Sequence, residues 1–336
     1  MLDTIAVSRG CKNSKGLIDA LKQVNTSFSL EDKASWGPVD AALRDSTMSC
    51  EMKLGLAHDL LGFEAQMPTS RPACAAVFLH IIDNCADHEE VFVSANYSLG
   101  VLSLEGVNMA RDGQMALKCF GDAAKMGHAL SIYQLAGMFL SGRDVKQDTA
   151  KVAKLLKLAV DRGLPQASTT LAELYNTGVG VPQDHELAAH YYEDAIQKGD
   201  VQAKAGLAVL YNNGKGKEQD FDKAFQLNTE AAEQGNVPLA HHNLGTHYFL
   251  GKGAEQSFDK ARESFERAAN LGFAPACFNL GNLYLQGRGC DQDLDLARKY
   301  YELAAHEIPD AASIIEKIDN MKAGKGADST PDSGSS

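Results

Sequence analysis

The sequence predicts an all-α protein in which short helix-turn-helix units repeat and stack into a solenoid. A Leu-Gly or Leu-Ala pair recurs six times at spacings of 36 or 37 residues, beginning at Leu99. A glycine lies seven residues after each of these leucines, and an aspartate or serine lies thirteen residues after the same leucine. A fixed period of this length is typical of supersecondary units that bury their apolar faces only against neighbouring copies.

The first helix of each unit is defined by small residues placed four positions before the leucine. These residues are Ala95, Ser131, Ala167, Ala203, Ala240 and Ala276. In five units an aromatic residue follows the leucine by four positions. Offsets of four lie on one stripe of a helix with 3.6 residues per turn. We therefore expect the first helices to pack through this stripe, with small residues where two backbones approach.

The turn after each first helix carries two residues that favour left-handed backbone. The first is the glycine already described, and the second is Asn108, Asp144, Gly180, Gly216, Gly253 or Gly289. Glycine, asparagine and aspartate are the residues that tolerate this conformation best. In the stretch YNNGKGKEQD these glycines resemble a phosphate-binding loop, but Lys217 is followed by Glu218 and no buried strand precedes them. Such a loop needs G-x-x-x-x-G-K-[ST] after a strand, so we expect no nucleotide and no other cofactor.

The second helix begins at a residue that accepts hydrogen bonds from free backbone N–H groups. These predicted N-caps are Asp112, Asp148, Asp184, Asp220, Ser257 and Asp293. A bulky residue follows each cap by eight positions, except that Asn228 interrupts the row. A glycine closes five of the second helices, as at Gly127 and Gly235, and is expected to act as a C-cap.

This pattern resembles the Sel1-like repeats, relatives of the tetratricopeptide repeat with a longer turn. Residues 167–203 hold the cleanest copy. The resemblance implies a right-handed α-solenoid and a non-enzymatic adaptor that binds a partner protein. Two alternatives stay open: a hydrolase of the exported, cysteine-rich Sel1-like kind, and an assembly factor or structural subunit of an organelle.

The chain divides into five predicted segments. Residues 1–49 form an extension with one short helix, and residues 50–94 form a degenerate capping repeat. Six repeats fill residues 95–312. A capping helix covers residues 313–323, and residues 324–336 are a low-complexity tail expected to be disordered.

Composition limits the partners and the compartment. The formal net charge of −12 argues against nucleic acid or an anionic membrane as the main partner, because both bind clustered Lys and Arg. Apolar runs are too short to span a bilayer. Seven cysteines occur without a C-x-x-C pair, and none lies between Cys119 and Cys277. We interpret this as a reducing compartment and expect a cytoplasmic protein, with a mitochondrial one as the alternative because basic residues gather near the N-terminus.

Metal-binding and catalytic patterns are weak. The histidines of HELAAH are five positions apart and point to different sides of a helix, whereas zinc proteases need a spacing of four. His80, Cys85 and His88 resemble part of a ligand set, but no second pair completes four ligands. We expect no metal site and no catalytic residues.

A candidate binding surface follows from the helical register. Positions −2, +2 and +5 from the leucine lie opposite the packing stripe. In the related repeats the first helix lines a concave surface, so a peptide or helix of the partner is expected there, while packing against the next helix is the competing interpretation. The predicted partner-binding residues are Tyr97, Val101, Tyr133, Leu140, Thr169, Glu173, Asn176, Val209, Asn212, His242, Thr246, Phe249, Phe278 and Asn282.

Overall fold

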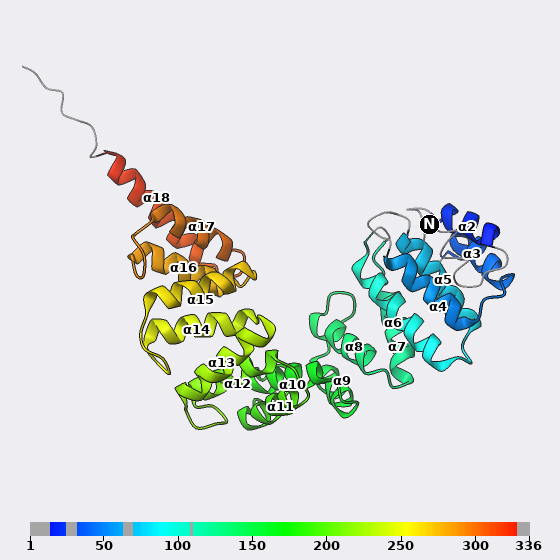
Figure 1. Cartoon of the computed structure of the whole chain (residues 1–336), viewed down its shortest axis with the longest axis horizontal. Coiled ribbons are helices and arrows are strands. Elements are labelled where there is room, and N and C mark those ends of the chain that lie inside the picture. The colour runs from blue at the N-terminus through cyan, green and yellow to red at the C-terminus, as the bar shows by residue number, and fades with distance from the viewer. Residues whose placement is uncertain (1–13, 25–31, 63–69, 108–109, 328–336) are drawn as a thin grey trace, which may run out of the picture. The chain divides into compact units, whose positions relative to one another are not determined.

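The computed structural model describes residues 14–24, 32–62, 70–107 and 110–327 (Figure 1). Seventeen α-helices occupy these ranges, and no β-strand occurs in them. The all-α prediction is therefore confirmed. No helix in the same ranges is long and apolar enough to cross a membrane.

The chain separates into two compact units. Unit 1 contains Met1–Ala167 and Val179–Val181, and unit 2 contains Ser168–Gly178 and Pro182–Ser336. The helices of unit 1 are α2 (Ser14–Gln23), α3 (Lys33–Arg44), α4 (Cys50–Gly62), α5 (Ser70–Asn84), α6 (Glu89–Glu105), α7 (Gly113–Lys125), α8 (Ala129–Ser141) and α9 (Thr149–Asp161). Unit 2 holds most of α10 (Pro165–Thr177), then α11 (His185–Gln197), α12 (Gln202–Asn213), α13 (Phe221–Gly235), α14 (Pro238–Leu250), α15 (Phe258–Asn270), α16 (Ala274–Gln286), α17 (Leu294–Ala304) and α18 (Asp310–Ala327).

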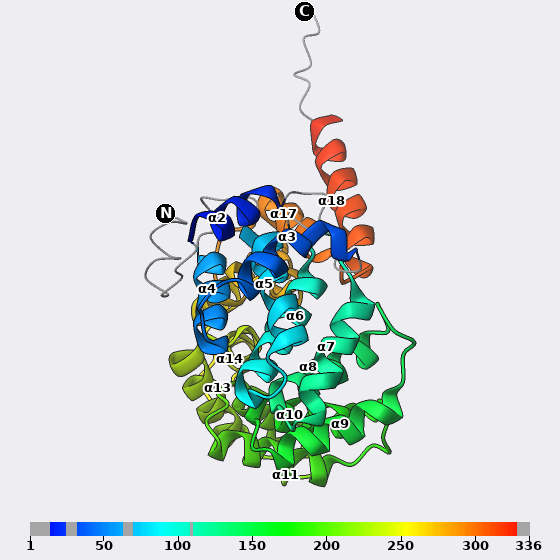
Figure 2. The same ribbon diagram turned by 90° about the vertical axis from the view of Figure 1, so that its right-hand side faces the viewer.

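Both ends of the chain carry helices beyond the repeats. The sequence predicts one short helix before residue 50, but α3 is a second one, and α2 and α3 lie beside α4 and α5 (Figure 2). Leu17, Trp36 and Phe78 join these helices in one buried core. At the other end α18 runs from Asp310 to Ala327, longer than the predicted capping helix. The predicted disordered tail lies mostly in residues 328–336, outside the described ranges.

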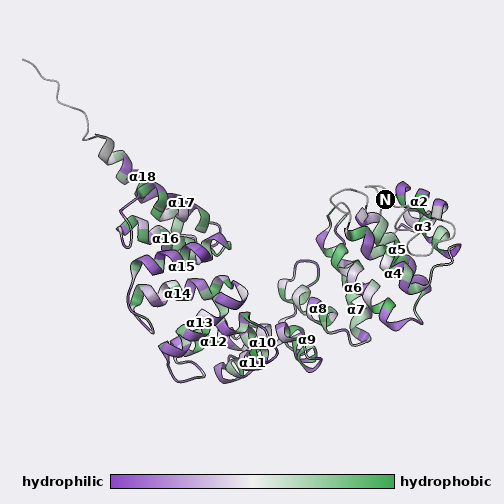
Figure 3. Cartoon of the chain, in the orientation of Figure 1, coloured by the Kyte–Doolittle hydropathy of each residue, from purple (hydrophilic) through white to green (hydrophobic). Residues whose placement is uncertain are grey.

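The second helix of each repeat begins at the N-cap that the sequence predicts. All six predicted N-caps accept a hydrogen bond from the first turn of the following helix. The first turn glycine has positive φ in every repeat, and so does the second at Gly180, Gly216, Gly253 and Gly289. In Figure 3 helix α15 is mainly hydrophilic. Its buried residues are Ala261, Phe265 and Ala268, so the helix is amphipathic.

Three backbone predictions need correction or lie outside the described ranges. Asp144 does not adopt positive φ; its carboxylate pairs with Arg111 instead. Gly235 remains helical, and Asn236 with φ +51° takes the left-handed position after α13. Asn108 falls outside the described residues.

A glutamine side chain, which the repeat pattern did not predict, braces the turn in five of the six repeats. In five repeats the glutamine before the N-cap donates from Nε2 to the backbone carbonyl seven residues earlier, over 2.8–2.9 Å. The accepting residues are Leu140, Asn176, Asn212, Phe249 and Leu285. These are the +5 positions, so the brace fixes the helix end that carries part of the predicted binding surface. The repeated glutamine was visible in the sequence at a constant spacing.

Candidate functional site

Most of the predicted partner-binding residues are neither fully buried nor fully exposed. Twelve of the fourteen are half-buried, whereas Thr169 is buried and Glu173 is exposed. Thr169 donates to the Asp200 carboxylate over 2.6 Å, which gives it a structural partner. Half-buried side chains both pack against a neighbour and present a surface, so the two interpretations of this stripe are compatible.

In unit 1 the structure brings two of the predicted residues together. Tyr97 and Val101 of α6 line a hollow of about 350 Å³. Arg71 and Glu105 form an ion pair at its lining. The Tyr97 ring also contacts the rings of Phe120 and His128. Tyr133 and Leu140 are half-buried on α8 and do not line this hollow.

In unit 2 a larger hollow forms where α10 and α12 face the starts of α14 and α16. We call it the Glu173 hollow; it measures about 450 Å³. Its lining residues are Glu173, Asn176, Tyr192, Gln202, Gly206, Val209, Val237, Pro238, Leu239 and Phe273. Glu173 is accessible to solvent, yet protein atoms surround its carboxylate. This desolvation, together with the nearby charge of Asp200, raises the pKa of Glu173.

A second hollow lies between the C-terminal halves of α14 and α16. We call it the Phe249 hollow, and its volume is about 310 Å³. Its lining includes three of the predicted partner-binding residues, Thr246, Phe249 and Asn282, together with Leu250, Phe265, Asn279, Leu283 and Gln286. The Asn282 side chain accepts from the Tyr301 hydroxyl over 2.8 Å. We call the parts of α10, α12, α14 and α16 that line the two hollows the first-helix face.

His242 connects the two hollows of the first-helix face. Its ring packs 5.5 Å from the ring of Phe265, which lines the Phe249 hollow, and 5.2 Å from that of Phe273, which lines the Glu173 hollow. Burial lowers the pKa of His242 to about 4, so the ring is neutral at physiological pH. Its Nδ1 atom is buried and has no hydrogen-bond partner among the described residues.

Asn212 belongs to a polar network inside the repeat stack. Its amide nitrogen lies 3.3 Å from Nε2 of His247, whose Nδ1 donates to the Lys252 carbonyl over 2.6 Å. Asn228 is fully buried and lies 3.5 Å from the same Nε2 atom, while its own oxygen accepts from Asn243. The asparagine that interrupts the row of bulky residues therefore replaces an apolar plug with hydrogen bonds. Phe278, in contrast, packs edge-on against Tyr301.

The opposite side of the same helix pairs differs in charge. A hollow of about 470 Å³, which we call the Glu263 hollow, is lined from α13, α14 and α15. Its lining includes Glu233, Lys260, Glu263 and Arg267. Of the residues that line the two first-helix hollows, only Glu173 is charged.

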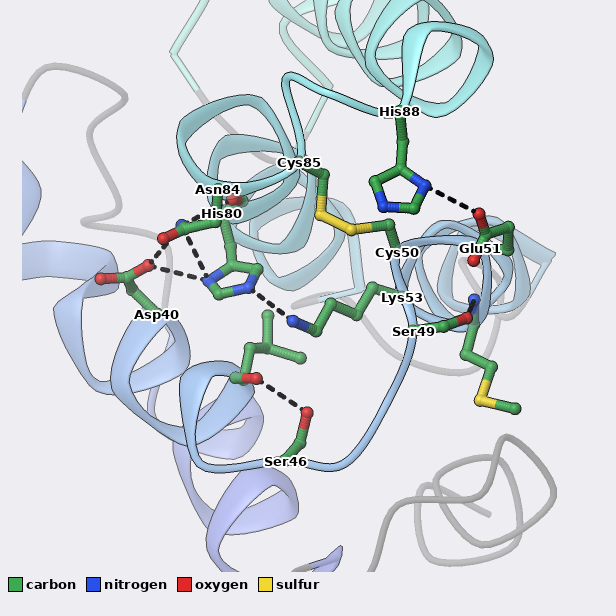
Figure 4. Close-up of a disulfide and its surroundings, with 12 residues drawn as sticks. Asp40, Ser46, Ser49, Cys50, Glu51, Lys53, His80, Asn84, Cys85 and His88 are labelled. Atoms are coloured by element: carbon green, nitrogen blue, oxygen red, sulfur yellow. Dashed lines mark hydrogen bonds and ion pairs between the residues drawn. A yellow bond between two sulfur atoms is a disulfide. The ribbon is translucent and has the colours of Figure 1, made fainter.

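The histidines and cysteine weighed as metal ligands have other partners (Figure 4). Cys85 forms a disulfide with Cys50, which joins the start of α4 to the residue after α5. His88 pairs with Glu51 at the surface, and no group of three metal-ligating side chains is found in the described ranges. The disulfide differs from the expectation of reduced cysteines that their number and spacing in the sequence suggest. Cys74, Cys119, Cys277 and Cys290 are free thiols.

His80 instead belongs to a buried ion network between α3, α4 and α5. Its Nδ1 lies 2.8 Å from the Asp40 carboxylate and its Nε2 lies 3.1 Å from Nζ of Lys53. Burial lowers the pKa of both His80 and Lys53. Burial alone would raise the pKa of Asp40, but the His80 hydrogen bond and the Arg44 charge lower it. The network fixes α3 on the helices that the disulfide joins.

Comparison with known proteins identifies the repeat. The Sel1 repeat matches residues 93–128, 129–164, 165–200, 201–236, 238–273 and 274–307. No curated protein sequence matches the chain. A Sel1 repeat protein from Oxalobacter formigenes superposes with a TM-score of 0.66 at 20% identity, over 75% of this chain and 96% of that one.

A second solved structure, a protective antigen of uropathogenic Escherichia coli with an SLR fold, gives a TM-score of 0.61 at 23% identity. The alignment covers 77% of this chain and 54% of the antigen, so the chain spans about half of that protein. At these identities the two structures show the fold alone. The six repeat matches and the capped helix pairs together establish that the chain belongs to the Sel1 repeat family, an all-α solenoid of the tetratricopeptide-like kind.

Proposed function

We propose that the chain is a non-enzymatic adaptor that binds a segment of a partner protein on the first-helix face of unit 2. Sel1 repeat proteins generally mediate protein–protein interactions. The observation that supports this face is its composition. In a chain of net charge −12, its two hollows are lined by apolar, aromatic and amide side chains with a single carboxylate.

Such a lining suits a peptide. The buried cores of protein interfaces are depleted in charge and enriched in aromatic residues. Phe249 and Phe273 supply apolar surface for side chains, while Asn279, Asn282 and Gln286 supply amide groups able to bond a peptide backbone. Amide groups both donate and accept, as an extended backbone requires.

The predicted residues of unit 1 form a second candidate region. Tyr97 and Val101 offer an apolar surface next to the Arg71–Glu105 ion pair. Tyr133 and Leu140 extend the proposed surface along α8. We assign the main contact to unit 2, because its two hollows are joined by the His242 ring.

A charge placed in the face tests this function. Thr246 lines the Phe249 hollow and Thr229 lines the Glu263 hollow. Both are half-buried, and each hydroxyl donates to a carbonyl of its own helix, so Thr246→Arg and Thr229→Arg are matched. Proteins captured from native cells by the full chain should be lost with Thr246→Arg and kept with Thr229→Arg. Val209→Arg, in the Glu173 hollow, should behave like Thr246→Arg.

Equal capture by all variants would exclude the first-helix face as the binding surface. Circular dichroism of each variant shows whether a loss of capture reflects unfolding. A variant that keeps the wild-type helical signal and melting temperature but loses the captured proteins supports the proposal.

For the compartment we favour an oxidising environment over the cytoplasm predicted from the cysteine spacing. Disulfides persist mainly in exported proteins and in oxidising compartments. The Cys50–Cys85 bond lies before the six repeats, while Cys119 and Cys277 inside them are free and buried. The hydrolase alternative implies cysteine-rich repeats, and among the described residues the repeats contain no disulfide, so the Cys50–Cys85 bond supports the compartment and not that alternative.

A further inference from the structure

We propose that the Glu173 hollow is a specificity pocket for a basic side chain, so that the adaptor selects peptide segments carrying arginine or lysine. This inference rests on the proposed function and adds the chemistry of the partner.

Within the described ranges, the Glu173 carboxylate is unpaired, unlike the carboxylates around it. Neighbouring carboxylates on the same repeats have protein partners: Glu193 pairs with Lys217, Glu230 with Lys204, and Asp200 accepts from Thr169. Among the described residues, the Glu173 carboxylate has no hydrogen bond or ion pair. It is also the only charged group that lines the hollow.

The shape and lining of the hollow suit a long amphipathic side chain. Val209, Val237, Leu239 and Phe273 form apolar walls, while Asn176, Gln202 and Tyr192 add polar groups to the lining, and the charge of Glu173 reaches Tyr192. Arginine and lysine place their methylene stems on apolar surface and keep the cationic group at a polar end. A guanidinium group can also stack on an aromatic ring such as Phe273.

Other occupants are disfavoured by the same residues. A purely apolar side chain would cover Glu173 and leave a buried carboxylate without a partner, which is costly. An acidic side chain would add a third carboxylate to Glu173 and Asp200, whose mutual repulsion already raises the pKa of Glu173. A cation relieves this repulsion, and binding should therefore release a proton near the pKa of Glu173.

Peptide selection on the full chain tests the proposal. A random dodecapeptide library is selected on wild type, on Glu173→Gln and on Glu263→Gln, which removes an identical charge from the opposite hollow. We expect wild type and Glu263→Gln to enrich peptides with a common basic position, and Glu173→Gln to lose that preference. A wild-type consensus without a basic residue overturns the proposal.

A double-mutant cycle then separates recognition from folding. The selected peptide is synthesised with arginine or with citrulline, its neutral isostere, and its affinity is measured by fluorescence anisotropy. Citrulline should weaken binding to wild type about 10- to 100-fold, as expected for a charge-assisted hydrogen bond. Binding to Glu173→Gln should change less than about threefold. Equal effects on both proteins contradict the pocket assignment.

The same peptides distinguish this failure from failure of the proposed function. If Thr246→Arg abolishes binding of selected peptides that lack a basic residue, the first-helix face binds peptides and only the basic pocket is wrong. If Thr246→Arg and Thr229→Arg bind all selected peptides equally, the proposed function fails as well.

Discussion

The ring of Phe265 lies against Gly245, so closely that a Cβ at Gly245 would come within 2.6 Å of two ring atoms. Two other repeats show the same relationship, between Gly100 and Phe120 and between Gly281 and Tyr301. The repeat at residues 129–164 has Ala136 and Leu156 at these positions, both buried. In these four repeats a glycine accompanies an aromatic ring and an alanine accompanies a leucine, whereas the repeat at residues 165–200 combines Ala172 with Tyr192.

Gly245→Ala should destabilise the protein by about 1–2 kcal/mol, because overpacking outweighs the helix propensity gained from alanine. The double variant Gly245→Ala with Phe265→Leu copies the Ala136 and Leu156 pair and should recover part of the loss. Urea unfolding of the two single variants and the double variant measures the coupling. Strictly additive effects would show that the two residues do not constrain one another.

Substitution of the turn glycines should destabilise the protein for two separable reasons, backbone strain and steric clash. Gly216 has φ +68°, and a Cβ there would lie 2.1 Å from the His185 carbonyl oxygen, whereas Gly199 has φ +91° and open space around it. Gly199→Ala should cost about 1 kcal/mol from backbone strain, and Gly216→Ala about 3 kcal/mol or more because a backbone clash is added.

Gly137 is the control for these turn variants. It lies inside α8 with open space around it and ordinary φ. Gly137→Ala should stabilise by up to about 1 kcal/mol through helix propensity. Thermal melts rank the three variants.

ATP should leave the melting temperature of the wild type unchanged, because the turn glycines are needed for left-handed backbone and not for phosphate binding. A melting temperature raised by ATP would support the nucleotide interpretation instead.

The Cys50–Cys85 disulfide should stabilise the N-terminal helices. Its 35-residue separation predicts about 2–4 kcal/mol from the restricted unfolded chain. The double variant Cys50→Ala with Cys85→Ala should speed hydrogen exchange in α4 and α5 and leave α15 unchanged. Cys290→Ala, which removes a free thiol, is the control. Reduction of the denatured wild-type chain should add two titratable thiols, and a constant thiol count would exclude the bond.

Acid should weaken the protein partly through His242. Its folded-state pKa is lowered from 6.5 to about 4, so the unfolded state takes up a proton first as the pH falls. The contribution of neutral His242 to the free energy of unfolding is therefore fully present above pH 6.5. It is lost as the pH falls towards 4, by roughly 2–3 kcal/mol for a pKa shift of this size. His242→Gln should flatten the decline of the urea midpoint over this range. His190→Gln, at an exposed position of α11, should not flatten it.

Glu173 should cost stability at neutral pH. Because its folded-state pKa is raised, the folded protein holds the proton more tightly, and stability falls as the pH rises through that pKa. Glu173→Gln should raise the free energy of unfolding at pH 7 by less than about 1 kcal/mol, since the group is accessible to solvent, and should raise the melting temperature accordingly. The difference should vanish below pH 4. A lower melting temperature of Glu173→Gln at pH 7 would mean that the carboxylate is paired, contrary to the basic pocket.

The sequence by itself determined the repeat and its local structure. N-caps such as Asp220 and left-handed glycines such as Gly214 act within one turn of their own helix, so position and residue type suffice to predict them. The small residues of the first helices, for example Ala203, are buried as their spacing predicts. Even here two positions differ from the prediction: Asp144 does not adopt positive φ, and Asn236 replaces Gly235 as the left-handed residue.

Only the tertiary structure decided which residues meet across the helix pairs. Cys50 and Cys85 are joined over 35 residues, and the Glu173 hollow combines residues from α10 to the start of α16. The predicted stripe marked Glu173 and Val209 by register, but not Tyr192, Gln202 or Phe273, which complete the hollow from outside that stripe. The physical reason is that periodicity fixes the direction of a side chain on its own helix, whereas pairing, burial and pKa depend on distances to helices elsewhere in the chain.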